Sequence, residues 1–231
     1  KVLTRERGRP FRSPSGKYLL WYDAGARAHK CYNIDTDKTA DITSEKTGIF
    51  YDEKNDRPMD PWDYGDGGFT NDEEQVIIYD RYDIWLLDPD GVDTPKRLTY
   101  GRESHTRYRI IDLDLEESIV DITQPLILHG FNEVDKSESY GSVVVEFGKI
   151  KTFMTAAKRM DRSPNKAKNA DVIVTTMEDY ATFPDLTLTD SKFSKFTKIS
   201  DANPQQSEYR WGDIKLHKWV SAVGDTLTGL I

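Results

Sequence analysis

The sequence predicts an all-β protein, a partial β-propeller of about four four-stranded blades. Short apolar or alternating runs stand between turn signals, long helical periodicity is nearly absent, and one order of elements recurs along the chain. Equivalent points of the recurring units lie on the order of 40 to 60 residues apart, the range in which propeller blades repeat. Because a single small sheet is marginal in water, such units need radial stacking to bury both faces.

The first unit contains the run SPSGKYLLWYD, which begins at Ser13. Its predicted elements are a turn at 13–16, strands at 17–22 and 30–34, a turn at 35–37 and an edge strand at 38–43. Cys31 is the single cysteine, so it cannot form an internal disulfide. We expect it to be a small core residue on the second of these strands.

The second unit contains QVIIYDRYDIWLLDPDG and repeats this order. Its predicted elements are a turn at 70–74, strands at 75–79 and 83–87, a turn at 88–91 and an edge strand at 96–99. The acids of its second turn, with Asp93, raise the alternative of a calcium loop. No bidentate glutamate follows at the required spacing, and Asp-Gly is ordinary hairpin-turn chemistry, so a turn without metal is predicted.

Two longer and weaker units follow. The predicted strands are 118–121, 125–132, 141–147 and 149–156 in the third unit, and 171–176, 185–189 and 195–200 in the fourth. A short helical piece is expected near 155–160, and the insert at 53–68, rich in Asp, Pro and Gly, is expected to be an irregular connection between blades. The alternative fold, a β-sandwich with irregular loops, gives no reason for the recurring order of elements.

Composition restricts the partners of the chain. The 231 residues carry a net charge of -8, and lysine and arginine are scattered, so a nucleic-acid partner is not expected. No apolar run approaches the roughly 20 residues of a membrane helix, which predicts no membrane span. The polar N-terminus lacks the apolar core of a signal peptide, and both ends have the character of an internal piece of a longer chain.

Several of these stretches resemble known families. SPSGKYLLWYD, and YDIWLLDPDG with PKRLT, resemble the TolB-type propeller repeat. The tail ISDANPQQSEYRWGDIKLHKWVSAVGDTLTGLI resembles the propeller exit of the prolyl oligopeptidase family of serine peptidases, nearest to its dipeptidyl-peptidase and acylaminoacyl-peptidase branch. The resemblance implies propeller blades over 1–200, and over 201–231 a propeller exit that begins the hinge to an α/β-hydrolase domain. It also implies an extracytoplasmic, periplasmic location.

The function that the resemblance implies is a noncatalytic segment that gates peptide access to a hydrolase domain outside the chain. A G-x-S-x-G nucleophile elbow does not occur in the sequence, and the four histidines have no serine and aspartate partners identifiable by order. The chain itself is therefore predicted to be inactive and to need no cofactor, while a parent serine peptidase supplies the chemistry. The alternatives are a stand-alone TolB-like scaffold that binds a protein or peptide, and a glycan-acting propeller that uses Trp62 or Trp85.

Two groups of residues are candidates for substrate binding. Trp62 and Tyr64 stand among acids in a loop that can line a cavity and receive a peptide amine. Arg102, Glu103 and Arg107 form a polar run at a blade junction, where arginine can clamp a carboxylate or carbonyl. A solvated turn or surface loop is the competing interpretation for each. Four units also leave exposed blade edges, through which the chain can associate with itself.

Overall fold

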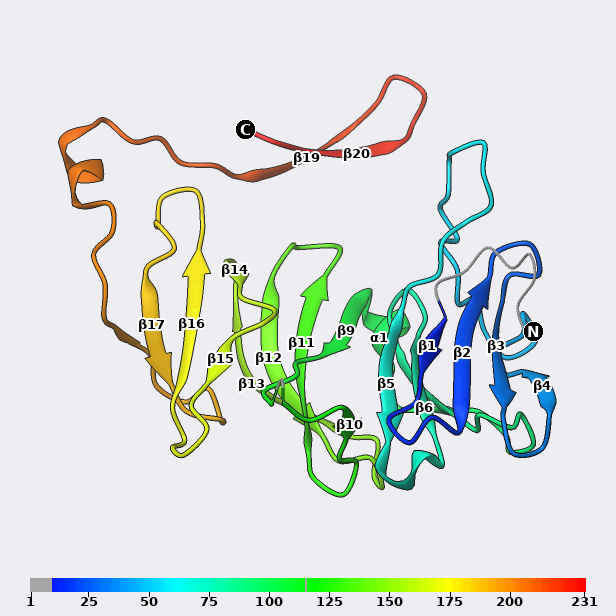
Figure 1. Cartoon of the computed structure of the whole chain (residues 1–231). Helices are drawn as coiled ribbons and strands as arrows, with labels where there is room; N and C mark the ends of the chain where they lie inside the picture. The colour runs from blue at the N-terminus through cyan, green and yellow to red at the C-terminus, as the bar shows by residue number, and fades with distance from the viewer. Residues whose placement is uncertain (1–9, 115) are drawn as a thin grey trace.

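The computed structural model describes residues 10–114 and 116–231, and in them four β-sheets follow one another side by side (Figure 1). We call these sheets blades 1 to 4 in chain order. The first nine residues of the segment assigned to the blades lie outside the described residues. The predicted all-β partial propeller of about four blades is confirmed.

Blades 1 and 2 match the two strongest units of the sequence. Blade 1 consists of β1 (Phe11–Arg12), β2 (Tyr18–Asp23), β3 (Ala28–Asn33) and β4 (Lys38–Asp41). Blade 2 consists of β5 (Asp66–Thr70), the 3-10 helix η1 (Asn71–Glu73), β6 (Val76–Tyr79), β7 (Ile84–Leu87) and β8 (Lys96–Arg97). Residues 118–121, expected to open the third unit, instead form β10 (Ile119–Val120), which pairs in parallel with β5 in blade 2.

Blades 3 and 4 contain the weaker units. Blade 3 follows the helix α1 (Gly101–Ser104) and consists of β9 (Thr106–Ile110), β11 (Leu126–Asn132), β12 (Glu138–Val143) and β13 (Ile150–Ala156). Blade 4 consists of β14 (Arg159–Met160), β15 (Asn165–Lys166), β16 (Ile173–Glu178), β17 (Leu186–Thr189) and β18 (Thr197–Lys198). The prediction of a short helix near 155–160 is wrong, because these residues form the end of β13 and the strand β14. Strand pairing, such as Met160 opposite Met177, overrides their helical composition.

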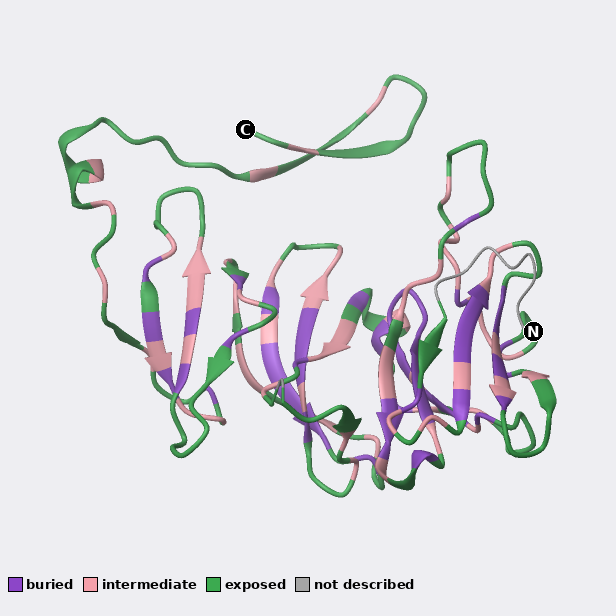
Figure 2. Ribbon diagram, in the orientation of Figure 1, coloured by how far each residue is buried: buried purple, intermediate pink, exposed green. Residues whose placement is uncertain are grey.

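The core lies between the blades, in three apolar clusters at the three blade interfaces (Figure 2). The continuous apolar sequence of β6 is explained by burial of both faces of this strand. Val76 and Ile78 belong to the cluster shared with blade 1, whereas Ile77 and Tyr79 belong to the cluster shared with blade 3. Alternate side chains point to opposite faces of a strand, so a strand buried on both faces must be apolar at every position.

The insert at 53–68 is irregular as expected, except that its last residues begin β5. A Cβ on Gly67 would lie 2.7 Å from both Ile77 Cγ2 and Tyr79 Oη, so this strand can approach β6 only with glycine at that position. The glycines that look like a turn signal in the sequence are therefore part of a strand.

The chain leaves blade 4 through the 3-10 helix η2 (Pro204–Glu208) and ends in a hairpin of β19 (Leu216–Val220) and β20 (Thr226–Leu230). In the described part of the chain these two strands pair only with each other. The hairpin lies apart from the sheets, beyond one end of the blades (Figure 1). Among the described residues, the structure contains no helix of the length and apolarity that crossing a membrane requires.

Candidate functional site

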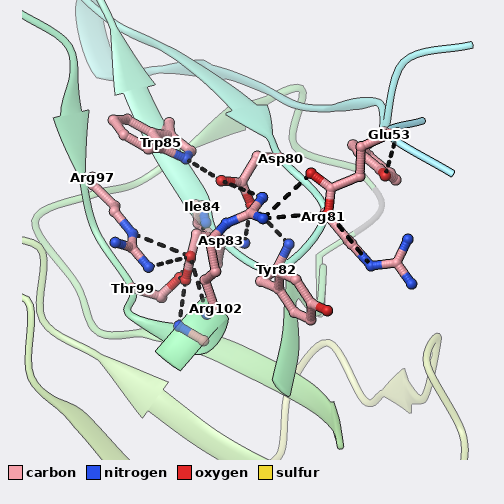
Figure 3. A network of polar contacts seen from close by, with 12 residues as sticks. Glu53, Asp80, Arg81, Tyr82, Asp83, Ile84, Trp85, Arg97, Thr99 and Arg102 are labelled. Carbon is pink, nitrogen blue, oxygen red and sulfur yellow. Dashed lines mark hydrogen bonds and ion pairs between the residues drawn. The ribbon is translucent and has the colours of Figure 1, made fainter. Parts of the chain in front are cut away.

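A network of arginines and carboxylates surrounds the turn between β6 and β7 of blade 2 (Figure 3), and Arg81 links it to Glu133 in a turn of blade 3. The turn between β6 and β7 is closed by Asp80, whose Oδ1 accepts the backbone N–H groups of Tyr82 at 2.7 Å and Asp83 at 2.6 Å. Such a turn, in which an Asp side chain caps the backbone, lets the polar sequence DRYD connect two buried apolar strands. It presents Arg81 to the neighbouring blade.

Arg81 is the centre of the network. Its Nη2 donates to Glu133 Oε1 at 2.8 Å and Oε2 at 3.1 Å, and its Nε lies 3.9 Å from Glu53 Oε1. Burial opposes the charge of Glu133, but the hydrogen bonds from Arg81 and Tyr82 outweigh burial and hold the pKa of Glu133 below its ordinary value. Within residues 10–114 and 116–231, the buried Nε of Arg81 has no hydrogen-bond partner.

The fully buried carboxylate of Asp83 also holds this turn in place. It accepts hydrogen bonds from the Thr99 hydroxyl at 2.8 Å, from the backbone N–H of Gly101, and from Arg97 Nη2 at 2.6 Å. Burial is the main cause that raises the pKa of Asp83. These contacts tie β7 to β8 and to the start of α1, so the segment that carries the predicted polar run is held rigidly.

Three of the predicted substrate-binding residues converge on this network. Arg102 Nη1 lies 3.3 Å from both carboxylate oxygens of Glu53, and Arg107 Nε lies 2.7 Å from Glu133 Oε1. The Tyr64 hydroxyl accepts the backbone N–H of Glu53 at 3.1 Å. The structure thus brings Tyr64, Arg102 and Arg107 to one end of the blades, around Glu53 and Glu133.

The other two predicted residues lie elsewhere. Glu103 is exposed and makes two hydrogen bonds to Arg97, at 2.9 and 2.6 Å, on the other side of the α1 turn. This contact with Arg97 is the main cause that lowers the pKa of Glu103. Trp62 is 64% exposed and lines a separate cavity in blade 1.

That cavity, of about 520 Å³, combines aromatic side chains with the carboxylates of Asp63 and Asp66. Although solvent reaches Asp66, its concave surroundings desolvate it and raise its pKa. His29 lies in the wall with its Nε2 3.1 Å from Asp63 Oδ2 and its Nδ1 3.5 Å from the Thr43 hydroxyl. This Thr-His-Asp order is structural, because the Thr43 hydroxyl is buried and accepts the backbone N–H of His29 at 2.7 Å.

A larger cavity, of about 880 Å³, lies between β5, β10 and residues 110–114 and 124–127. Apolar side chains of β9 to β11 form part of its wall, and five carboxylates form another part. The carboxylates are those of Asp66, Asp112, Asp114, Glu117 and Asp121. Among the described residues none of its lining side chains is basic, so this cavity favours cationic or neutral groups over anions.

Sequence reasoning missed Arg81, Glu53 and Glu133, which organise the site. Arg81 and Glu133 are 52 positions apart in the chain and each stands in what looks like an ordinary hairpin turn. The available signal was a charged turn between two continuously apolar strands. Such strands are buried on both faces, so their turn abuts a neighbouring blade.

Comparison with known proteins bears on the fold. No protein-family model and no curated protein matches the sequence. A protein assigned as a dipeptidyl aminopeptidase IV from Bacteroides ovatus superposes with a TM-score of 0.62 and 16% identity, over 95% of this chain and 32% of that one. The oligogalacturonate lyase of Vibrio parahaemolyticus superposes with a TM-score of 0.56 and 12% identity, over 85% of this chain and 55% of that one.

A protein assigned as TolB from Agrobacterium tumefaciens superposes with a TM-score of 0.50 and 17% identity, over 87% of this chain and 65% of that one. The fold is that of a β-propeller. At such identities the likeness establishes the fold, which proteins of different activity share. The chain spans about a third of the length of the peptidase-type protein and about half that of the lyase.

Proposed function

We propose that this chain is the noncatalytic β-propeller segment of a serine-type exopeptidase or oligopeptidase, and that it gates peptide access to a hydrolase domain outside the chain. The observation that carries the proposal is the terminal hairpin of β19 and β20, which follows the last blade but pairs with no blade strand in the described chain. In this proposal residues 201–231 form the propeller exit and the beginning of the hinge.

The hairpin has the properties of a segment that needs a further partner. Trp219, Val220, Leu227 and Leu230 are 42%, 68%, 42% and 65% exposed. An isolated two-stranded hairpin is marginally stable in water, and apolar side chains of this kind gain stability when another domain covers them. The fold likeness to a peptidase-type protein of which this chain spans 32% supports a hydrolase domain as that partner.

The arginine and carboxylate network is placed to meet a peptide on its way to such a domain. The turns after β11 and β16 lie at the end of the blades that faces the hairpin (Figure 1), and the contact of Arg81 with Glu133 brings the turn after β6 to the same end. We assign Tyr64, Arg102 and Arg107 to substrate binding, with Trp62 in the neighbouring blade 1 cavity receiving a cationic group.

Extending the reading frame past Ile231 tests the proposal. A hydrolase partner predicts a G-x-S-x-G motif within roughly 150 residues, because that motif places the nucleophilic serine of the fold. The extended protein should hydrolyse chromogenic peptides, whereas residues 1–231 alone should not. Turnover by this chain alone, or a stop codon or further blade in place of a hydrolase domain, would contradict it.

Substitutions in the extended protein test the binding residues. Arg102→Gln removes a cation from the network and should raise KM for short peptides about tenfold, equivalent to about 1.4 kcal/mol of binding free energy. Arg159→Gln is the matched control, since Arg159 is an exposed arginine paired with Glu178 in blade 4. Equal KM values for the two variants would remove Arg102 from the binding site.

A glycan-acting propeller is the second candidate, favoured by the fold likeness to the oligogalacturonate lyase and by the exposure of Trp62. Trp85 does not serve this role, because it packs against the core of blades 1 and 2 and donates its Nε1–H to Asp80 at 3.2 Å. Titration with acidic oligosaccharides separates the candidates. Binding that Trp62→Ala abolishes would support the glycan-acting propeller, and absence of binding would remove it.

A further inference from the structure

The cavity of blade 1 has an aromatic wall. Four aromatic side chains line its volume of about 520 Å³, those of Phe11, Trp21, Tyr22 and Trp62. Two of them, Phe11 and Trp62, are 40% and 64% exposed, so a ligand in solution can reach their rings. The face of an aromatic ring carries partial negative charge and attracts a cation. Such a wall favours an organic cation over an anion.

The backbone on both sides of the Trp62 side chain is fixed. The carbonyl of Trp62 accepts the backbone N–H of Asp52 at 2.7 Å. The carbonyl of the preceding residue, Pro61, accepts the hydroxyl of Tyr22 at 3.1 Å. These contacts hold the attachment point of the indole at the cavity before any ligand binds, which lowers the ordering cost of binding.

The two carboxylates of this cavity differ in their partners. Asp63 Oδ2 lies 3.1 Å from His29 Nε2 and accepts the backbone N–H of Gly65 at 3.2 Å. Asp66 accepts the backbone N–H of Gly68 at 3.2 Å. Within residues 10–114 and 116–231, no side-chain nitrogen of lysine, arginine or histidine approaches the Asp66 carboxylate to 4.0 Å. Asp66 therefore brings an unpaired negative charge to the aromatic wall.

The surroundings of Asp66 favour the arrival of a cation. Desolvation is the main cause that raises the pKa of Asp66, and the charge of Asp63 adds to it, against the hydrogen bond from Gly68 and the effect of His29. A cation in the cavity would offset both the desolvation and the repulsion. In the described part of the chain no three His, Cys, Asp or Glu side chains are grouped to hold a metal ion, which favours an organic cation.

The wall also discriminates between kinds of ammonium group. A primary ammonium brings three N–H donors, and each needs an acceptor once it leaves water. Among the polar side chains of the wall, the Tyr22 hydroxyl donates to Pro61 and the Asp63 carboxylate already contacts His29. A quaternary ammonium has no N–H donor, and its charged methyl groups bind aromatic faces directly. Its charge then needs a single carboxylate, which Asp66 provides.

We propose that the blade 1 cavity binds a quaternary ammonium group, with Trp62 as its aromatic contact and Asp66 as its counterion. This inference deepens the proposed function, and rests on it, in that Trp62 there receives a cationic group. The methylated character of the cation rests on the wall of the cavity alone.

Titration of this chain with three small probes tests the proposal by the NMR signal of the Trp62 indole N–H and by calorimetry. The probes are choline, its uncharged isostere 3,3-dimethyl-1-butanol, and ethanolamine, which has the same charge without the methyl groups. Choline should shift the Trp62 signal and bind about tenfold or more tightly than either of the others. Equal affinity for choline and the uncharged alcohol would overturn the choice of a cation. Ethanolamine binding as tight as choline binding would overturn the quaternary ammonium.

Variants complete the test. Trp62→Ala should weaken choline binding about tenfold or more, and Trp62→Phe should give a smaller loss because it keeps an aromatic face. Asp66→Asn should also cost about tenfold for choline and leave the uncharged alcohol unaffected.

Matched controls come from residues that do not line the cavity. Trp211→Ala removes a tryptophan that is 51% exposed, and Asp60→Asn removes an exposed carboxylate of the same insert as Trp62. Both should bind choline normally, and a loss in them equal to that of Trp62→Ala and Asp66→Asn would overturn the assignment. Because binding is measured on this chain, its failure is distinct from the absence of a hydrolase domain beyond Ile231.

Discussion

Replacing Glu133 by Gln should destabilise the packing of blade 2 against blade 3. The Glu133 side chain is 14% exposed, accepts hydrogen bonds from Arg81 and the hydroxyl of Tyr82 at 2.8 to 3.1 Å, and forms an ion pair with Arg107 at 2.7 Å. Removing one partner of a largely buried ion pair costs about 3 to 5 kcal/mol, because the remaining charge stays desolvated without compensation. Since Glu53 lies 3.9 Å from Arg81 and offsets part of that charge, we expect about 3 kcal/mol.

Urea denaturation followed by tryptophan fluorescence measures this loss. With an m-value of about 2 to 3 kcal/mol/M, Glu133→Gln should lower the midpoint by about 1 M. Glu178→Gln is the matched control, because Glu178 pairs at 2.7 Å with Arg159, whose side chain is 75% exposed. An exposed pair of that kind contributes about 0 to 1 kcal/mol. A loss for Glu133→Gln no larger than that of the control would refute the reasoning.

The pH dependence supplies a second check of the same variant. The folded-state pKa of Glu133 is depressed, so its ionised form stabilises the fold above the pKa of the unfolded chain, near 4.5. This contribution is lost as pH falls through the lower, folded-state pKa. The stability gap between the wild-type chain and Glu133→Gln should be full at neutral pH and should shrink below about pH 4.5. A gap that stays constant down to acid unfolding would contradict the assigned role of the charge.

Three further predictions concern the blade interfaces. Glu73→Gln should cost about 2 kcal/mol in urea denaturation, because this buried carboxylate accepts hydrogen bonds from two serines of blade 1, whereas the exposed Glu74→Gln should be neutral. Gly67→Ala should lower the melting temperature by about 4 to 8 °C through overpacking, while Gly25→Ala, which meets its nearest neighbour at 3.5 Å, should leave it within error. Burial raises the pKa of Cys31 to about 12, so a thiol reagent at pH 8 should label it only after unfolding, and rapid labelling of the folded chain would show that the strand opens.

Much of the fold could be predicted because the blade strands carry local patterns. The continuous apolar run of β6 and the turn at 88–91 are set by residues adjacent in the chain, and Gly91 has the positive φ of 68° that the turn requires. The first strands of the blades escaped prediction for the opposite reason. β5 begins with Asp66 and two glycines and β9 begins with polar residues, and their strand conformation depends on pairing with β6 and β11.

The candidate site likewise contains residues that the sequence could predict and residues that it could not. The polar run that contains Arg102 and Arg107 is visible in the sequence as charged residues at a blade junction. Its partners are supplied by distant loops, Glu53 at 49 positions from Arg102 and Glu133 at 26 positions from Arg107, and no local pattern marks them.

The sequence by itself therefore determined the all-β class, the repeat, the two strongest blades and the polar run that follows the second of them, because each depends on spacing and turn chemistry within a few residues. Only the tertiary structure decided which charged side chains form ion pairs and which cavity Trp62 lines. It also decided that the hairpin of β19 and β20 lies apart from the blades. Ion pairing and burial are set by distances across blade interfaces, and a linear pattern does not contain them.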